Sequence, residues 1–258
     1  LFLEDMCHYL RENGIDAADV FRGIASKPFG LELGAPGPGI GGHCIPVDPL
    51  YLLHHARLAD VPLRMIEHCD RMNCRLLPDR LMAFAQRAML ASGADPAECP
   101  VVIVGVAYKP NVPDIRESPG LRLAARVLRD RPYLQNVFYH DPVYQKQRER
   151  LHITEPLLVE DRIALEPMSQ SELVARLSDE SPVCLLLACG HAELESGEVG
   201  AAAKKCKAAV LVDYVNLTSR WKAAEQHHAY VWGRGRTHQP QGLPESPDTH
   251  DWGRTGDV

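Results

Sequence analysis

"VVIVGVAYK" (residues 101–109) decides the fold of this chain. An uninterrupted apolar run of this length is typical of a strand that is buried on both faces of a sheet. After a polar loop, Ser118 and Pro119 are suited to a helix N-cap and first helical position, and the leucines that follow recur at helical spacing. A buried strand, a loop and a helix in this order predict one unit of a parallel α/β sheet.

Further apolar runs extend this pattern on the C-terminal side. We predict strands within residues 136–142, 182–190 and 208–215, and an edge strand within residues 229–233. Between them, Ser169 and Glu172 have the spacing of a capping box, which marks a helix start. The expected fold over residues 98–232 is therefore a doubly wound parallel sheet with helices on both faces.

The first ninety residues predict an all-helical unit over residues 1–92. One helix should end at Gly14 and a second should begin at Asp16, because these residue types suit a helix C-cap and N-cap. A long helical pattern runs from about residue 62 to 91, and Pro78 predicts a kink or junction in it. From about residue 233 to 258 the chain has almost no aliphatic residues, so we predict a disordered tail there.

Composition limits the classes of function. The chain has 258 residues, of which 45% are hydrophobic, and a net charge of −6 with mixed signs, which argues against a nucleic-acid surface. It has no apolar run long enough to cross a bilayer, and we expect no signal peptide. Eight cysteines without a CxxC pair indicate a reduced, cytoplasmic protein. Because Leu1 opens the chain inside a helical pattern, we expect a piece of a longer protein.

The segment "PGPGIGGHCIPVDPLYL" (residues 36–52) carries the candidate chemistry, and we expect a shaped loop over residues 36–49 because proline and glycine oppose regular structure. A cysteine beside a helix start can be a reactive thiolate, so Cys44 is a candidate nucleophile. Gly41 allows a ligand close to the backbone, and Asp48 could orient water or an amine. The residues alone leave a second interpretation open, in which Cys44 is a buried structural cysteine in an irregular turn.

Two other chemistries are compatible with the residues. A cysteine hydrolase would pair Cys44 with a distant histidine, but the sequence shows no oxyanion loop specific to that class. A structural zinc site would draw its ligands from a scattered set, and no short-spaced pair of ligands recurs in the chain. That set comprises His43, Cys44, His54, His55, Cys69 and Cys74. We expect no metal.

The run "GPGIGGHCIPVDP" resembles the active-site signature of the UDP-glucose/GDP-mannose dehydrogenase family, closest to its UDP-N-acetylhexosamine 6-dehydrogenase members. Upstream, "NGIDAADVFRGIASKPFG" resembles the helix pair of the family's central domain, and downstream "GVAYKPNVPDIRESPG" resembles the opening of its UDP-binding domain. The similarity spans about residues 1–235. It implies a helical central domain, used for dimerisation, followed by a Rossmann-like UDP-binding domain.

The resemblance implies a four-electron oxidation. Such enzymes convert the C6 alcohol of a nucleotide sugar to the carboxylate with two NAD+. Cys44 would add to the intermediate aldehyde, and water would cleave the thioester that results. A thiolate suits this role because it can hold an acyl group and then release it. Asp48 would help to position the water or a catalytic lysine.

The resemblance also implies binding roles for four residues. Gly41 and Phe29 would line the sugar-nucleotide site, and Lys109 would contact the substrate. Arg116 would reach toward NAD. The alternative for both basic residues is a solvated loop charge. The family resemblance further implies a homodimer that pairs through the long helix, with a UDP-sugar as the substrate.

The sequence departs from the family pattern in two ways. It has no G-x-G-x-x-G dinucleotide fingerprint, so the main NAD-binding domain is absent from this chain. Val215, in "DYVN", stands where the family usually has an arginine. We therefore expect this chain alone to bind a UDP-sugar weakly and to lack dehydrogenase activity. The alternative is a non-catalytic remnant that binds UDP-sugars and dimerises.

Overall fold

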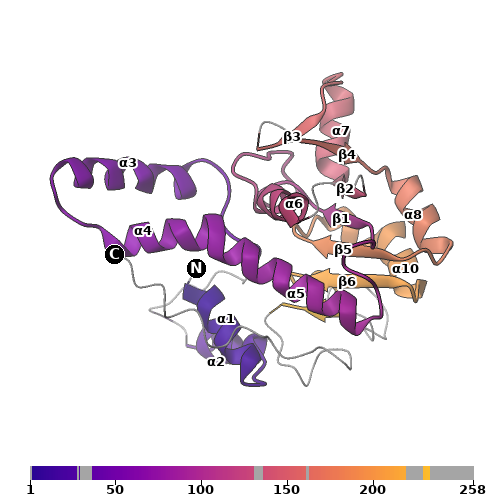
Figure 1. Ribbon diagram of the computed structural model, residues 1–258, viewed down its shortest axis with the longest axis horizontal. Coiled ribbons are helices and arrows are strands. Elements are labelled where there is room, and N and C mark those ends of the chain that lie inside the picture. The colour runs from indigo at the N-terminus through magenta and orange to yellow at the C-terminus, as the bar shows by residue number, and fades with distance from the viewer. Residues whose placement is uncertain are drawn as a thin grey trace.

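The computed structural model describes residues 2–27, 29, 37–130, 136–160, 163–218 and 229–232. Figure 1 shows a twisted sheet flanked by helices. A helical arm, formed by residues 44–71, projects from it to one side. The tail predicted over residues 233–258 lies outside the described residues.

Within the described residues, seven strands form one sheet in the order β3-β4-β2-β1-β5-β6-β7. All neighbours pair in parallel except β3 and β4, which are antiparallel. The five predicted strands are confirmed, whereas β3 and β4 were not predicted. The strands are β1 (Val101–Val104), β2 (Val137–His140), β3 (Leu157–Val159), β4 (Ile163–Pro167), β5 (Val183–Leu187), β6 (Ala209–Asp213) and β7 (Ala229–Val231).

Helices cover both faces of the sheet, as predicted, and two separate apolar clusters fill the two interfaces. Ser118 accepts a hydrogen bond from the Leu121 amide at the start of α6, and the predicted capping box at Ser169 is present. These helices are α6 (Pro119–Asp130), α7 (Pro142–Arg150), α8 (Gln170–Ser178), α9 (Ala192–Ser196) and α10 (Glu198–Lys205).

The N-terminal part is helical. The first helix ends before Gly14, whose φ is 74°, and Asp16 caps the second, so both predicted boundaries are confirmed. The predicted long helix is also present, and it contains a π-helical segment immediately before Pro78. The elements are α1 (Phe2–Glu12), α2 (Ala17–Ala25), α3 (Cys44–Leu58), α4 (Arg64–Arg71), η1 (Met72–Leu76) and α5 (Leu77–Ala91).

The prediction of a loop over residues 36–49 was wrong at its C-terminal end. Helix α3 begins at Cys44, so Asp48 is helical rather than part of a loop. Pro46 lies in the first turn, where backbone N–H groups have no acceptor within the helix, so the missing donor costs little. Pro49 costs one further backbone hydrogen bond, which the rest of the helix tolerates.

The C-terminal half of the long helix belongs to the core of the sheet. Leu77, Leu81 and Phe84 are fully buried in the same apolar cluster as β1 and α6. Packing therefore continues across the boundary expected near residues 92–98. Farther toward its N-terminus the helix leaves this core, and Met65 is 76% exposed.

Glu4 and Arg11 tie α1 to the sheet. The Arg11 guanidinium is buried 4.3 Å from the ring centre of Trp232 and 5.0 Å from that of Phe84. Glu4 accepts hydrogen bonds from the Trp232 indole at 3.0 Å and from the Gly37 amide at 2.8 Å. Burial raises the pKa of Glu4 in spite of these bonds. The Glu4 side chain therefore connects α1, the end of β7 and residues 37–43, which we call the glycine-rich segment.

Gly105 follows β1 with a φ of 87°, and a Cβ there would lie 2.5 Å from Cys189 Cβ. We predict that Gly105→Ala lowers the free energy of unfolding by about 3–5 kcal/mol, because it adds an overlap with fixed atoms to the left-handed backbone penalty. Gly93 is a matched control, since its φ is 76° but no atom lies within 4 Å of a Cβ. Gly93→Ala should cost only about 1–2 kcal/mol. Urea denaturation measures both, and equal losses would contradict the steric argument.

Candidate functional site

At Gly41 and Gly42 the glycine-rich segment lies too close to neighbouring atoms to carry a side chain. A Cβ on Gly41 would lie 2.6 Å from the Glu117 carbonyl oxygen, and one on Gly42 would meet the ring of Tyr108. Gly39 and Gly42 also have φ values of 127° and 90°, in the region that favours glycine. Glycine is therefore required here by close approach of the chain itself. The predicted contact of Gly41 with a ligand stays a prediction.

Asn73 and Arg122 clamp the same segment from two helices. The Ile40 amide donates to Asn73 Oδ1 at 2.8 Å, and Asn73 Nδ2 donates back to the Ile40 carbonyl at 3.0 Å. Arg122 Nη1 donates to that carbonyl as well, at 2.8 Å. Two residues on, the Gly42 amide donates to the Arg116 carbonyl at 2.9 Å. Both backbone groups of Ile40 are thus satisfied by side chains, which fixes the path that leads to Cys44.

Cys44 is the first residue of α3, and its side chain is exposed. Asp48 lies one turn later, at the spacing that places two side chains on one face of a helix, and it is also exposed. His43 occupies the N-cap position without a side-chain capping bond. The predicted thiol therefore stands at the N-terminus of a 15-residue helix.

Two predicted cations lie in the segment that borders the thiol. Arg116 forms a bidentate ion pair with Asp114, with contacts of 2.6–3.0 Å. This bond raises the pKa of Arg116, and Cys44 is near enough to contribute. The pKa of Asp114 is lowered, chiefly by Arg116 and to a smaller extent by Lys109. Arg116, Lys109 and Asp114 therefore form one charged cluster beside Cys44.

The structure does not join every predicted residue to this cluster. Phe29 is 70% exposed with its ring 5.0 Å from the Lys27 ammonium, and no contact among the described residues links it to Cys44 or Lys109. Val215 is half-buried, and its Cγ1 lies 4.0 Å from the position of a Cβ on Gly37. It therefore places an apolar group beside the glycine-rich segment.

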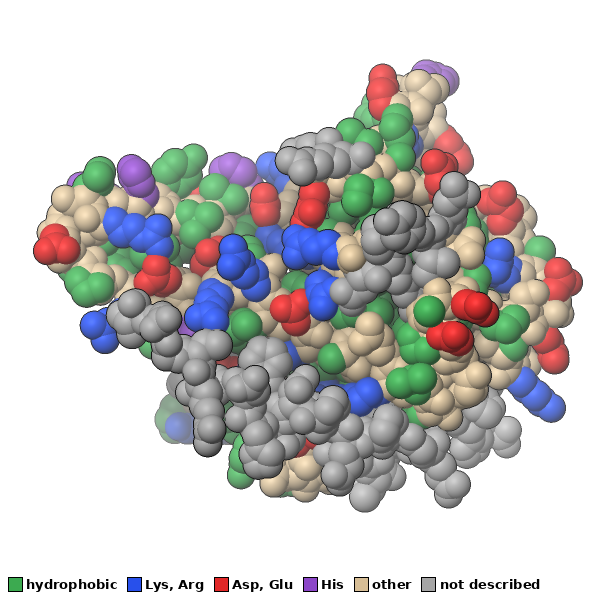
Figure 2. All heavy atoms as spheres, in the orientation of Figure 1, with side chains coloured by type: hydrophobic (Ala, Val, Ile, Leu, Met, Phe, Trp, Pro, Cys, Tyr) green, Lys and Arg blue, Asp and Glu red, His purple; other side chains and the backbone are tan. Residues whose placement is uncertain are grey.

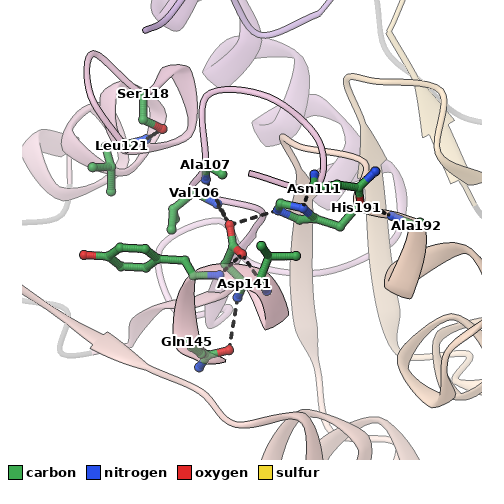
Figure 3. A network of polar contacts seen from close by, with 11 residues as sticks. Val106, Ala107, Asn111, Ser118, Leu121, Asp141, Gln145, His191 and Ala192 are labelled. Carbon is green, nitrogen blue, oxygen red and sulfur yellow. Dashed lines mark hydrogen bonds and ion pairs between the residues drawn. The ribbon is translucent and has the colours of Figure 1, made fainter. Parts of the chain in front are cut away.

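Asp141 organises the carboxyl ends of the strands (Figure 3). It is fully buried at the end of β2, and its Oδ2 accepts from the amides of Val106 and Ala107 at 2.8 and 2.9 Å. Its Oδ1 accepts from the first amides of α7. Burial alone would raise the pKa of Asp141, but the hydrogen bonds, above all that from His191, hold it below its ordinary value.

His191 follows β5, is fully buried, and links Asp141 to the loop after β1. Its Nε2 lies 3.0 Å from Asp141 Oδ2, and its Nδ1 accepts from the Asn111 amide at 2.9 Å. Because an amide can only donate, Nδ1 carries no proton, and Nε2 must donate to Asp141. The Asn111 side chain in turn accepts from the amide of Ala192, at the start of α9.

Sequence reasoning missed Asn73, Asp141 and His191 as site residues. Asp141 had a usable signal, because an aspartate followed by proline directly after a strand is typical of an N-cap. His191 also follows a predicted strand, where parallel sheets gather their functional residues. Asn73 had none, because its orientation depends on a π-helical segment that no pattern in the sequence predicts.

The described residues contain no group of three or more potential metal ligands from His, Cys, Asp and Glu side chains. Among the same residues, no helix is both long enough and apolar enough to cross a membrane.

Two family models match the chain in the order that the structure suggests. Residues 2–75 match the central domain of the UDP-glucose/GDP-mannose dehydrogenase family, and residues 102–220 match its UDP-binding domain. Together the two matches span most of the chain. The chain belongs to the UDP-glucose/GDP-mannose dehydrogenase family.

Curated members of the UDP-glucose/GDP-mannose dehydrogenase family align with part of the chain. The UDP-glucose 6-dehydrogenase of Rhizobium meliloti is 31% identical over 121 residues, which cover 46% of this chain and 27% of that protein. The UDP-N-acetyl-D-mannosamine dehydrogenase of Salmonella typhi is 29% identical over 132 residues, covering 50% and 30%. The matched region therefore spans less than a third of these relatives.

Solved structures of the family share the fold. A UDP-D-ManNAc dehydrogenase from Pyrococcus horikoshii superposes with a TM-score of 0.67 and 20% identity, over 91% of this chain and 48% of that one. An NDP-N-acetyl-D-galactosaminuronic acid dehydrogenase from Methanosarcina mazei gives a TM-score of 0.67 and 19% identity, over 91% and 47%. The chain thus spans about half the length of these structures.

The turn after β1 does not fit a dinucleotide cofactor. In a dinucleotide-binding sheet, the amides of this turn and the following helix N-terminus hold the pyrophosphate. In this family member the amides of Val106 and Ala107 already donate to Asp141. Helix α6 begins only at Pro119 and is capped by Ser118. The sheet therefore has no cradle for NAD at this turn.

We predict that Asn73→Ala loosens the glycine-rich segment of this dehydrogenase-family chain. The change removes two hydrogen bonds from a buried backbone and should cost about 1–3 kcal/mol in the free energy of unfolding. It should also speed hydrogen exchange of the Ile40 amide. Arg75→Ala is the matched control, because Arg75 is exposed in the same π-helical segment and its loss should cost less than about 0.5 kcal/mol. Equal effects of the two changes would contradict the clamp.

Proposed function

We propose that this chain carries the nucleophile and the sugar-nucleotide site of a UDP-sugar 6-dehydrogenase. The proposal rests on one observation. Cys44 is the first residue of α3 and lies beside the charged cluster of Arg116, Lys109 and Asp114. A thiol at a helix N-terminus next to cations is the environment that favours a thiolate. The family membership of the chain supports the same assignment.

In this scheme the Cys44 thiolate attacks the C6 aldehyde carbon of the substrate and forms a thiohemiacetal. NAD+ would supply the hydride acceptor for both oxidations, and Arg116 is the residue of this chain proposed to face it. Once the thioester exists, water attacks its carbonyl carbon and the carboxylate forms as the thiolate leaves. Asp48, exposed one helical turn after Cys44, is the residue proposed to orient that water.

The proposed substrate is a UDP-N-acetylhexosamine. Support comes from relatives whose names specify UDP-N-acetyl-D-mannosamine, and from Lys109, whose ammonium suits a diphosphate. Gly41 would admit the sugar close to the backbone, and Phe29 is proposed to cover it. Val215 offers no charged donor, and the loss of one such bond weakens binding by about 1.5–3 kcal/mol. Affinity of this chain alone should therefore be low.

A second candidate function is a non-catalytic module that binds UDP-sugars and dimerises. One observation favours it, namely that the β1 turn is filled by Asp141 and offers no cradle for NAD. Uronate formation that depends on Cys44, measured in a preparation that oxidises the UDP-sugar, separates the two candidates. The eight cysteines, which include no CxxC pair, support a proposed reducing, cytoplasmic setting for either one.

We predict that Cys44 reacts with iodoacetamide and is protected by UDP-N-acetylmannosamine. Cys74 is the internal control, because it is also exposed but lies outside the charged cluster, and its labelling should not change. Peptide mass spectrometry measures both sites in one sample. Equal labelling of Cys44 with and without the sugar nucleotide would remove it from the substrate site.

We further predict that Cys44→Ala abolishes uronate formation in a preparation that oxidises the UDP-sugar, by about 1,000-fold or more. Cys44→Ser should retain slow turnover, because an alkoxide is a harder and less available nucleophile. Uronate is measured directly by mass spectrometry. Normal turnover by Cys44→Ala would refute the covalent mechanism.

The chain is also proposed to form a homodimer through its helical arm. An apolar groove of about 430 Å³ opens between α3 and α4, and exposed apolar side chains flank it. Ile45, Leu50 and Met65 line the groove. Further exposed apolar side chains of α3 are Tyr51, Leu52 and Leu58. We predict a dimer at micromolar concentration in sedimentation, and a monomer for Met65→Glu, which buries a charge in the proposed interface. A monomeric parent chain would count against the dimer.

A further inference from the structure

The loop after β1 (residues 105–111, the β1 loop) is anchored on both sides of Lys109. On one side Asp141 holds the amides of Val106 and Ala107, and on the other His191 holds the amide of Asn111. Figure 3 shows that all these contacts converge on the Asp141–His191 pair. Residues 108–110 therefore lie between two anchored residues, Ala107 and Asn111.

Within this span the backbone has little freedom to move. The Tyr108 amide donates to the Asp114 carbonyl at 2.9 Å, and the Tyr108 ring lies against Gly42. Pro110 fixes its own φ. Asn111 has a φ of 62°, a conformation that non-glycine residues adopt only when the surroundings hold them there. The bonds of Asn111 to His191 and Ala192 supply that hold.

The Asp141 carboxylate also restricts where an anionic ligand can bind. It fills the position at the β1 turn where the amides could otherwise donate hydrogen bonds to a phosphate, and it is itself negative. A phosphate is therefore excluded from the turn and must bind farther out, where Lys109 is exposed.

We propose that Asp141 and His191 are positioning residues that set where Lys109 presents its ammonium to the diphosphate of a nucleotide sugar. This inference rests on the proposed function, because Lys109 is assigned to the substrate there. Neither Asp141 nor His191 touches the ligand in this scheme. Both act through the backbone of the β1 loop.

A double-mutant cycle on UDP binding tests the proposal. The variants are His191→Phe, which keeps a buried ring but removes both hydrogen bonds, Lys109→Ala, and the two combined. Calorimetry is performed with UDP on the full 258-residue chain at a temperature where every variant is folded. We expect about tenfold weaker binding for each single variant, and no further loss in the double variant, because both remove the same contact. Losses that add, or unchanged binding by His191→Phe, would overturn the proposal.

Leu173→Ala is the control for lost stability. Leu173 is fully buried in the cluster on the other face of the sheet, so this change lowers stability without touching the β1 loop. Its affinity for UDP should equal that of the parent chain. A weakening equal to that of His191→Phe would reduce the effect to general destabilisation and overturn the proposal.

Hydrogen exchange separates failure of this proposal from failure of the proposed function. If the parent chain binds no UDP, the assignment of Lys109 to a substrate fails. The anchoring is then decided by amide exchange alone. His191→Phe should speed exchange at Tyr108, Lys109 and Asn111 while β6 stays protected. Unchanged exchange in the β1 loop would overturn the anchoring as well.

Discussion

Asp141 is a charge with no access to solvent, and burying a carboxylate is tolerable only when donors replace the water it loses. Those donors come from three places in the chain: the turn after β1, the first turn of α7 and the imidazole after β5. Satisfying this one group therefore fixes the carboxyl ends of three strands relative to one another. The same hydrogen bonds set the position of the β1 loop. That loop carries Lys109, so the position of the charged cluster beside Cys44 depends on it.

The long helix couples the glycine-rich segment to the same core. Its C-terminal half is buried against the sheet through Leu77, Leu81 and Phe84, so its position is set by the largest apolar cluster. The π-helical segment one turn earlier directs Asn73 at Ile40. Arg122 reaches the same carbonyl from α6, which packs on that sheet too. The backbone before Cys44 is therefore held by side chains that the core has already placed.

The sequence predicted the features that depend on residues close together in the chain. It did not predict those that depend on residues far apart in the chain. The strand runs, Gly14, Asp16 and the Ser169 capping box depend on neighbouring residues, and each is present where expected. The antiparallel pair β3–β4 was missed because its strands are short and half-exposed, so they lack a continuous apolar run. Cys44 and Gly41 could be selected from their local pattern. Asn73 could not, because its role depends on a contact with a residue 33 positions away. His191 had only its place after a strand as a signal, and its contact lies 80 positions away.

The arrangement has an energetic consequence for ligand binding. Ordering a loop on binding costs free energy, and each immobilised long side chain adds about 0.5–1.5 kcal/mol. Here the backbone of the glycine-rich segment and of the β1 loop is already fixed by Asn73 and the Asp141–His191 pair. Arg116 is likewise held by Asp114. The flexible part that remains is the exposed Lys109 side chain, so a sugar nucleotide would have little left to order. Such preorganisation would offset part of the affinity that we propose is lost at Val215, because it lowers the entropic cost of binding without adding a contact.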